Sequence, residues 1–379
     1  MVASSTVLET PVAMDVFPQS KPSSMGPSQG LRSLVVGLPG GALPANDDLS
    51  FSGKRGMLFD RVYVDGDGKR TRGALHDITN SELSDEDTSD VVVTPKQASG
   101  PVCIIDIDAP KRNDPQSCTS YVCDIYRNLR ASECKRRPSS WYLEQVQRDV
   151  NACMRGILVD WMVEVAEEYH MVPETLYLSV NYLDRVLSVL PIPQKKLQLV
   201  GVSCLMLASK YEEIFPQSLD EFSYITDRLY SKQDIKECEM EVLRTLKYEL
   251  TVPTIRPFLK RCLQAAKGGS KLEFLANYIC ELALLDYGML QFLPSMIAAS
   301  SVILAQITLN LPVWSSTLSY YSGYSKQELR DCARALHKLF SNAKKSGITA
   351  VSDKYAMHRY KCVSNISTNY SSLPEHLFC

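Results

Sequence analysis

Two stretches of the chain are near copies of each other: Tyr230-Ser-Lys-Gln-Asp-Ile-Lys-Glu-Cys238 and Tyr324-Ser-Lys-Gln-Glu-Leu-Arg-Asp-Cys332. Five of the nine positions are identical and the other four are conservative exchanges. Ser231 and Ser325 each stand three residues before an acidic residue, as in the capping box that begins a helix. A generic helix start would not also repeat the preceding Tyr and the later Cys. We therefore interpret the two stretches as the same helix of a duplicated unit.

A second pair of segments supports the duplication. Gly201–Ala208 (GVSCLMLA) resembles Ala298–Ala305 (AASSVILA) at nearly the same offset. Small residues on a strongly apolar helix are typical of a central helix that its neighbours approach closely. The repeat unit is therefore predicted to be a five-helix bundle of about 95 residues, present twice.

Helical periodicity fills the chain from about Val150 onward, and no run alternates with period two, so the predicted class is all-α. The first block of predicted helices is Met154–Tyr169, a helix that begins at Pro173, Lys196–Tyr211, Ser218–Ile225 and Ser231–Tyr248. The second block is Arg256–Ala266, Leu272–Tyr287, Ser295–Leu309, a short turn near Ser315–Tyr321, and Ser325–Ser341. Asp114 can cap a leading helix whose first residue is Pro115.

Composition divides the chain into three parts. Residues 1–113 are rich in Ser, Pro, Gly and Asp and have few aromatic residues, so we predict a disordered regulatory tail. Residues 114–252 form the leading helix and the first bundle, and residues 253–379 form the second bundle with a short tail. Pro253 separates the two bundles.

Charge and cysteine usage argue against several classes of protein. The net charge of -2 gives no general attraction to nucleic acid, and the 12 Cys include no Cys-x-x-Cys pair of the kind that zinc and redox sites use. The most apolar stretch, Met296–Leu309, is too short to cross a bilayer. We therefore expect no nucleic-acid or membrane partner, no metal and no cofactor. The scattered Cys are expected to be small buried residues.

The repeat fails at two charged positions. Lys210 aligns with Ile307, and Glu239 aligns with Ala333. A structural role would require the charges in both copies, so their absence from the second copy indicates a function confined to the first bundle. Two solvated surface charges remain the alternative.

Several motifs together resemble the cyclin family, and most closely the A-type (mitotic and S-phase) cyclins of plants. They are Met154-Arg-Gly-Ile-Leu-Val-Asp-Trp-Met-Val-Glu-Val-Ala-Glu-Glu-Tyr169, Tyr182-Leu-Asp-Arg185, Lys196-Leu-Gln-Leu-Val-Gly201 and Leu207-Ala-Ser-Lys-Tyr-Glu-Glu-Ile214. The resemblance implies two consecutive cyclin folds. It also implies a regulatory subunit that has no catalysis of its own, activates a cyclin-dependent serine/threonine kinase and controls the cell cycle.

The resemblance also assigns roles to residues. It implies that six residues of the first bundle contact the kinase: Lys210, Tyr211, Glu239, Leu243, Tyr248 and Leu250. It implies that six more form a shallow patch for substrates and inhibitors that carry an Arg/Lys-x-Leu motif: Met154, Ile157, Leu158, Trp161, Glu164 and Gln198. An apolar stripe at this helical spacing is more often part of a core, and that alternative stays open.

A charge on the mostly apolar helix that begins near Met154 needs a partner. The resemblance implies that Asp184 pairs with Arg155 as a structural ion pair.

In the tail, Arg72-Gly-Ala-Leu75-His-Asp-Ile-Thr-Asn80 resembles the destruction box that the anaphase-promoting ubiquitin ligase recognises. The same Arg-x-x-Leu core also occurs by chance at Arg55, Arg155 and Arg256. The family and two basic clusters, at residues 54–55 and 135–137, favour the nucleus, with the cytoplasm as a second location.

Two other classes of function compete with this interpretation. A transcription adaptor on the same tandem fold would bind DNA-associated factors, but it should have a basic face and usually a zinc ribbon. An enzyme would need a reactive constellation, and the sequence contains no Gly-rich phosphate loop, no His-x-x-x-His and no nucleophile elbow.

Overall fold

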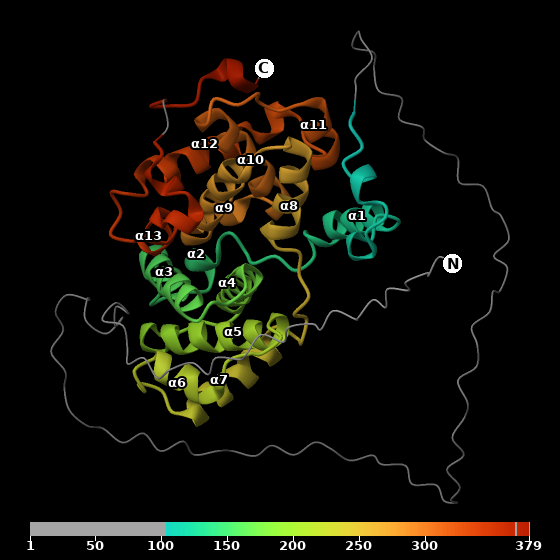
Figure 1. Cartoon of the computed structure of the whole chain (residues 1–379). Coiled ribbons are helices and arrows are strands. Elements are labelled where there is room, and N and C mark those ends of the chain that lie inside the picture. Colours follow the sequence, from blue (N-terminus) through green and yellow to red (C-terminus); the bar gives the residue numbers. More distant parts are fainter. Residues whose placement is uncertain (1–103, 368–369, 379) are drawn as a thin grey trace, which may run out of the picture. The chain divides into compact units, whose positions relative to one another are not determined.

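The computed structural model describes residues 104–367 and 370–378 (Figure 1). Every regular element in these stretches is a helix, which confirms the predicted class. The predicted tandem repeat is also confirmed, with helices α3–α7 in the first bundle and α8–α12 in the second.

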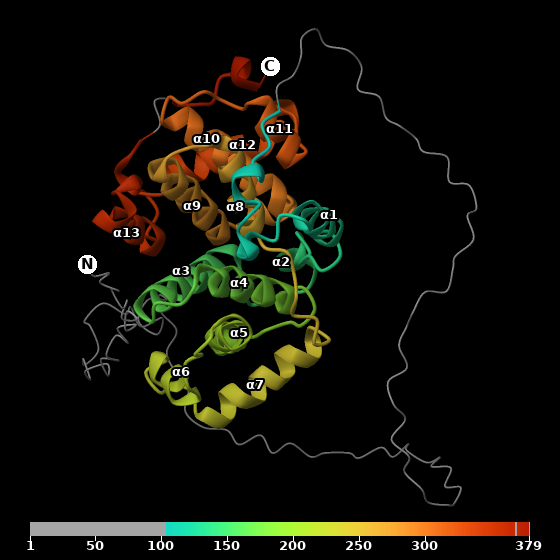
Figure 2. The same cartoon turned by 45° about the vertical axis from the view of Figure 1, so that its right-hand side comes forward.

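Helix α5 is the centre of the first bundle. The bundle consists of α3 (Ala152–Glu168), α4 (Pro173–Leu187), α5 (Leu197–Glu212), α6 (Leu219–Ile225) and α7 (Lys232–Thr245). Figure 2 shows α5 between α3 and α4 on one side and α6 and α7 on the other. Every residue from Val200 to Ser209 is buried. A Cβ atom on Gly201 would lie 2.8 Å from Leu158 Cδ1, so glycine allows α5 to pack closely on α3.

Helix α10 has the corresponding place in the second bundle. This bundle consists of α8 (Ile255–Ala266), α9 (Ser270–Leu285), α10 (Pro294–Thr308), α11 (Ser316–Ser322) and α12 (Lys326–Asn342). α10 packs against α8, α9 and α12, and all its residues from Ile297 to Thr308 are buried. The two segments that looked alike in sequence are therefore the central helices of the two bundles.

The near-identical stretches begin α7 and α12 with the same cap. The Ser231 hydroxyl accepts a hydrogen bond from the Asp234 backbone amide, and the Asp234 carboxylate accepts one from the Ser231 amide at 2.9 Å. Ser325 and Glu328 form the same reciprocal pair. The hydrogen bonds from Ser231 lower the pKa of Asp234, which keeps this cap charged near neutral pH.

The predicted leading helix is wrong at its start. Asp114 caps only one 3-10 turn, η2 (Pro115–Ser117), by accepting a hydrogen bond from the Gln116 amide. This turn ends at Cys118, whose backbone is left-handed with φ of 45°. The helix α1 (Val122–Ser132) follows. A short helix, α2 (Tyr142–Gln145), precedes the first bundle and was not predicted.

The predicted tail boundary at residue 113 is also wrong. Residues 104–113 include the turn η1 (Ala109–Lys111) and pack on the second bundle, where the Ile105 and Ile107 amides donate to side chains of α11. Ile107 is buried, and the Asp108 carboxylate accepts two hydrogen bonds from Arg261 of α8, at 2.5 and 2.7 Å. These contacts join residues about 150 apart, and local composition carries no signal for them.

The segment after α12 bridges the two bundles rather than trailing as a tail. It contains α13 (Ala350–Ala356) and the 3-10 turns η5 (His358–Tyr360), η6 (Val363–Asn365) and η7 (Glu375–Phe378). Two further turns of the described residues, η3 (Gln194–Lys196) and η4 (Tyr287–Gln291), lie within the bundles. The Ala350 amide donates to Asp160 of α3 at 2.9 Å. Lys354 lies 2.9 Å from the Glu281 carboxylate of α9, so α13 is bonded to both bundles.

The expectation of buried cysteines holds for part of the set. Five described cysteines are buried: Cys204, Cys238, Cys262, Cys280 and Cys332. Four others are exposed, namely Cys118, Cys123, Cys134 and Cys153, which corrects the prediction for these positions. Burial raises the pKa of Cys262, Cys280 and Cys332 to about 12, so these three thiols stay protonated and act as apolar side chains.

Candidate functional site

The two charges that depart from the repeat form an ion pair on the first bundle. Lys210 Nζ, in the last turn of α5, lies 2.7 and 2.9 Å from the two carboxylate oxygens of Glu239 on α7. The Lys210 side chain is 47% exposed and that of Glu239 only 11%. The nearly buried Glu239 carboxylate thus fixes the end of a lysine side chain that remains about half accessible to solvent.

In the second bundle the corresponding positions are closed to solvent. Ile307 and Ala333 are both buried in the apolar core. The two bundles therefore differ at these positions. The first bundle has a half-exposed ion pair there, and the second has buried apolar side chains.

The other predicted contact residues lie near this pair in the sequence and differ in exposure. Leu243 and Leu250 are partly buried against the core. Tyr211 is exposed, and its hydroxyl lies 2.6 Å from the Thr251 hydroxyl. Tyr248 is 62% exposed and has a left-handed backbone with φ of 59°. The turn after α7 thus presents one aromatic ring to solvent.

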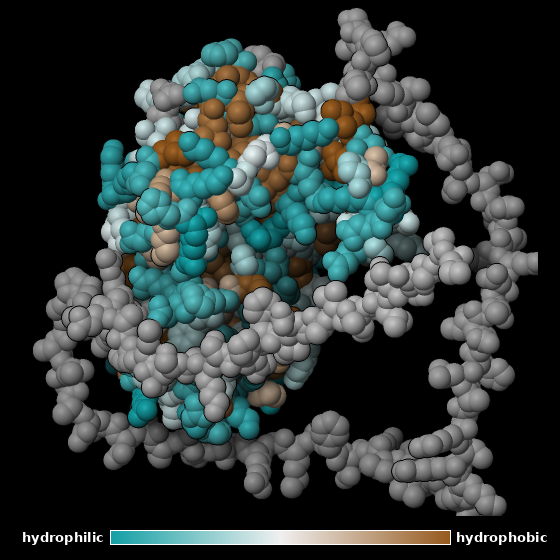
Figure 3. Space-filling model, in the orientation of Figure 1, coloured by the Kyte–Doolittle hydropathy of each residue, from teal (hydrophilic) through white to brown (hydrophobic). Residues whose placement is uncertain are grey.

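Two large apolar residues that were not predicted as part of the site follow Glu213, the residue that caps α5. Ile214 and Phe215 are each 88% exposed. On the face seen in Figure 3, hydrophobic residues form separate patches among hydrophilic ones. Large exposed apolar side chains next to one another are typical of an interaction surface, and these two follow Lys210 closely in the sequence. The signal in the sequence was the apolar pair between Glu213 and Pro216.

The predicted docking patch is more buried than expected. Leu158 is buried and Trp161 is only 4% exposed, so the apolar slot that they were expected to form belongs largely to the core. The stripe was therefore partly a core signal. The members that remain partly exposed are Met154, Ile157 and Glu164 on α3 and Gln198 at the start of α5.

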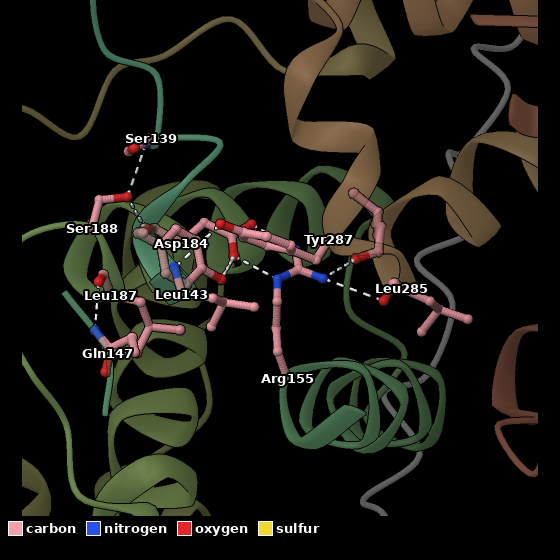
Figure 4. A network of polar contacts seen from close by, with 11 residues as sticks. Ser139, Leu143, Gln147, Arg155, Asp184, Leu187, Ser188, Leu285 and Tyr287 are labelled. Atoms are coloured by element: carbon pink, nitrogen blue, oxygen red, sulfur yellow. Dashed lines mark hydrogen bonds and ion pairs between the residues drawn. The ribbon is translucent and has the colours of Figure 1, made fainter. Parts of the chain in front are cut away.

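Arg155 and Asp184 form a buried bidentate ion pair (Figure 4). Arg155 Nε and Nη2 donate to the two Asp184 oxygens, each at 2.6 Å, and Tyr142 Oη donates to Asp184 at 2.8 Å. Arg155 Nη1 also donates to the Leu284 carbonyl at the end of α9, at 2.9 Å. Burial opposes the charge on Arg155, but Asp184 outweighs that effect and the pKa of Arg155 rises.

This ion pair connects both bundles, because α3 and α4 belong to the first and α9 to the second. Its contacts are therefore structural: the guanidinium of Arg155 is bonded to Asp184 of α4 and to the end of α9 (Figure 4).

The predicted degron residues Arg72, Leu75 and Asn80 lie outside the described residues. Within residues 104–367 and 370–378, no group of His, Cys, Asp and Glu is placed to hold a metal ion. None of the helices described has the length and apolar character needed to span a bilayer.

Together the geometry defines an all-α protein of two consecutive copies of one helical bundle, with a candidate interaction surface on the first copy. The model of the cyclin N-terminal domain matches residues 124–251, and that of the cyclin C-terminal domain matches residues 253–369. The chain belongs to the cyclin family.

Curated relatives and a solved structure agree with this assignment. The chain is 43% identical over 350 residues to Cyclin-A1-4 of Oryza sativa subsp. japonica, covering 88% of this chain and 97% of that protein. It is 48% identical over 293 residues to Cyclin-A1-1 of Arabidopsis thaliana, covering 75% of this chain and 63% of that protein. The chain thus spans less than two thirds of that second relative. These relatives are A-type cyclins of plants.

The fold is similar to that of a viral cyclin from herpesvirus saimiri. The TM-score is 0.51 at 23% identity, and the similarity covers 56% of this chain and 95% of the viral one. At this identity the likeness concerns the fold alone.

Proposed function

We propose that this chain is the regulatory subunit of a cyclin-dependent serine/threonine protein kinase and controls progression through the cell cycle. The single observation that carries the proposal is the Lys210–Glu239 pair, which is absent from the corresponding positions of the second bundle and leaves the lysine side chain half-exposed. Its chemistry suits a partner that presents backbone carbonyls or carboxylates together with an apolar side chain.

The proposed mechanism is allosteric. The first bundle docks beside the mobile regulatory helix of the kinase and favours the state in which the kinase's catalytic Lys–Glu pair forms. Phosphoryl transfer then takes place on the kinase, and this chain contributes binding free energy that differs between the two states. Adding the purified chain to a purified inactive kinase and measuring substrate phosphorylation tests this proposal.

We propose that the partly exposed side of α3 captures substrates and inhibitors that carry an Arg/Lys-x-Leu motif. Glu164 would attract the basic residue, and Met154 and Ile157 would contact the leucine.

Replacing Ile157 and Gln198 together by Ala is expected to weaken binding of an Arg-x-Leu peptide by about tenfold, because both side chains are accessible to a ligand. Fluorescence anisotropy of a labelled peptide measures this. Trp161 is less suitable, since truncating a buried Trp also costs about 3–5 kcal/mol of stability.

The matched control is the pair Val189→Ala and Gln194→Ala, two exposed positions of the first bundle outside the patch. The control should bind the peptide with wild-type affinity. The control and the Ile157/Gln198 variant should both bind the kinase as the wild type does. Unchanged peptide affinity in the Ile157/Gln198 variant would rule out docking at this site.

We propose that the tail carries a degron read by the anaphase-promoting ubiquitin ligase. Replacing Arg72 and Leu75 by Ala is expected to lengthen the half-life of the chain at the end of mitosis several-fold, because the recognised side chains are gone. A chase experiment in synchronised cells measures the half-life. The variant Arg55→Ala with Leu58→Ala removes the other Arg-x-x-Leu of the tail and should be degraded normally; equal turnover of the two variants would contradict the assignment.

We also propose a nuclear location with a cytoplasmic pool. Arg136 and Arg137 of one basic cluster are bonded within the fold, to Glu249 and to the Leu290 and Phe292 carbonyls, so Lys54–Arg55 is the more suitable import signal. Imaging of the tagged chain in dividing cells tests the location.

A further inference from the structure

A polar groove of about 640 Å³ lies between α12 and the C-terminal segment of residues 371–375. Five side chains of α12 line it: Arg334, His337, Lys338, Ser341 and Asn342. The segment contributes Ser371 and Ser372, which are both exposed. None of these residues belongs to the proposed kinase-binding or docking surfaces of the first bundle.

The C-terminal segment is held on the second bundle at several points. Leu373 is 5% exposed and Phe378 is 2% exposed, and the turn η7 packs against α12. His337 Nε2 donates a hydrogen bond to the Tyr370 carbonyl at 3.2 Å. Ser372 is thus the direct neighbour of a buried anchor, which keeps it at the groove.

The charges that line the groove do not balance. Two cations, Arg334 and Lys338, are four residues apart on one face of α12, and Glu375 is the single carboxylate among the lining residues. Arg334 is bonded to Glu375, whereas Lys338 is exposed and has no hydrogen bond or ion pair to another described residue. Burial lowers the pKa of His337, so its ring is neutral near pH 7. One positive charge is therefore left uncompensated, and the groove suits an anionic group.

We propose that Ser372 is a phosphorylation site, and that its phosphate binds Lys338 and Arg334 in this groove and holds the C-terminal segment on α12. A phosphoserine carries close to two negative charges at neutral pH and has three acceptor oxygens, which pair well with Arg and Lys. Glu375 follows Ser372 by three residues. The enzyme expected to modify this serine is therefore a serine/threonine kinase that selects acidic residues after its target.

The reaction requires ATP and such a kinase. The Ser372 hydroxyl oxygen forms a bond to the γ-phosphorus of ATP, the bond from this phosphorus to the ADP oxygen breaks, and the hydroxyl proton passes to the catalytic base of the kinase. The segment has to leave α12 for this step, because Leu373 beside the serine is buried. When the segment returns, the new charge lies beside Lys338.

Phosphorus-31 NMR of the full chain carrying phosphoserine at position 372 tests the contact. The second pKa of a phosphoserine is about 6, and neighbouring cations lower it because they favour the dianion. We expect a titration midpoint about one pH unit below that of a chain with phosphoserine at Ser120, an exposed serine outside the groove. Equal midpoints at the two positions would overturn the proposal.

The variant Lys338→Ala is expected to remove most of this difference. Lys271→Ala, at an exposed lysine of the second bundle outside the groove, should leave the difference unchanged. A midpoint at position 372 that Lys338→Ala does not move would contradict the assigned contact.

Mass spectrometry of the chain isolated from dividing cells tests whether the site is used. Phosphate on Ser372, absent from a Ser372→Ala variant, is the expected result. A chain without phosphate on Ser372 throughout the cell cycle would rule the site out. Neither measurement depends on kinase activation by this chain, so the proposed function and this proposal can fail separately.

Discussion

Replacing Asp184 by Ala is expected to lower the free energy of unfolding by about 3–5 kcal/mol, because it leaves the Arg155 guanidinium charged and unpaired inside the protein. Arg155 is buried, and both of its bonds to Asp184 are 2.6 Å long. Tyr142 would lose its acceptor at the same time. Urea denaturation followed by circular dichroism measures the change. For a domain of ordinary stability, this loss is a large share of the total.

The control for this prediction is Asp124→Ala. Asp124 also pairs with an arginine, Arg127, at 2.5 Å, but both side chains are exposed, and such pairs contribute about 0–1 kcal/mol. A loss below about 1 kcal/mol in Asp184→Ala would show that the buried pair is not the structural link between the bundles that we describe.

Replacing Lys210 and Glu239 together by Ala is expected to weaken kinase binding by at least about a hundredfold, because the double variant removes the charged centre of the proposed interface. The chain should stay folded, since no unpaired charge is left behind and Ile307 and Ala333 show that the bundle accepts apolar residues at the corresponding positions. Calorimetric titration with the purified kinase measures the affinity, and thermal unfolding checks the fold.

The control variant is Lys232→Ala with Asp220→Ala, which removes another Lys–acid pair of the same bundle, between α6 and α7. Both of its side chains are exposed. It should bind the kinase as the wild type does. If the Lys210/Glu239 variant bound as tightly as this control, the interface would lie elsewhere on the chain.

The helices and the duplication could be predicted because their causes are local. The capping boxes at Ser231 and Ser325 and the strongly apolar stretch around Ser203 each show in a few consecutive residues. That Arg155 has a partner followed from a general rule, namely that a charge on a buried helix needs one, while Asp184 as that partner came from the resemblance to the cyclin family.

The segments that escaped prediction are held by contacts between distant residues. Residues 104–113 depend on Arg261, and α13 depends on Asp160 and Glu281. The prediction that Trp161 is exposed failed for a related reason. Helical spacing shows which side chains share a face of a helix, but not whether another helix covers that face. The small residues from Gly201 to Ala208 predicted that neighbouring helices approach this helix closely, but only the structure shows that α3 meets Gly201, through Leu158.

The most direct test of the central claim is kinase activation. A purified monomeric cyclin-dependent kinase is mixed with the purified full chain, with the Lys210/Glu239 double variant, or with the Lys232/Asp220 control, and phosphorylation of histone is measured. Activation by the wild type and the control, and little or none by the double variant at the same concentration, is the predicted result. A wild-type chain that fails to raise the activity of any such kinase, or a double variant that raises it as fully, would contradict this account.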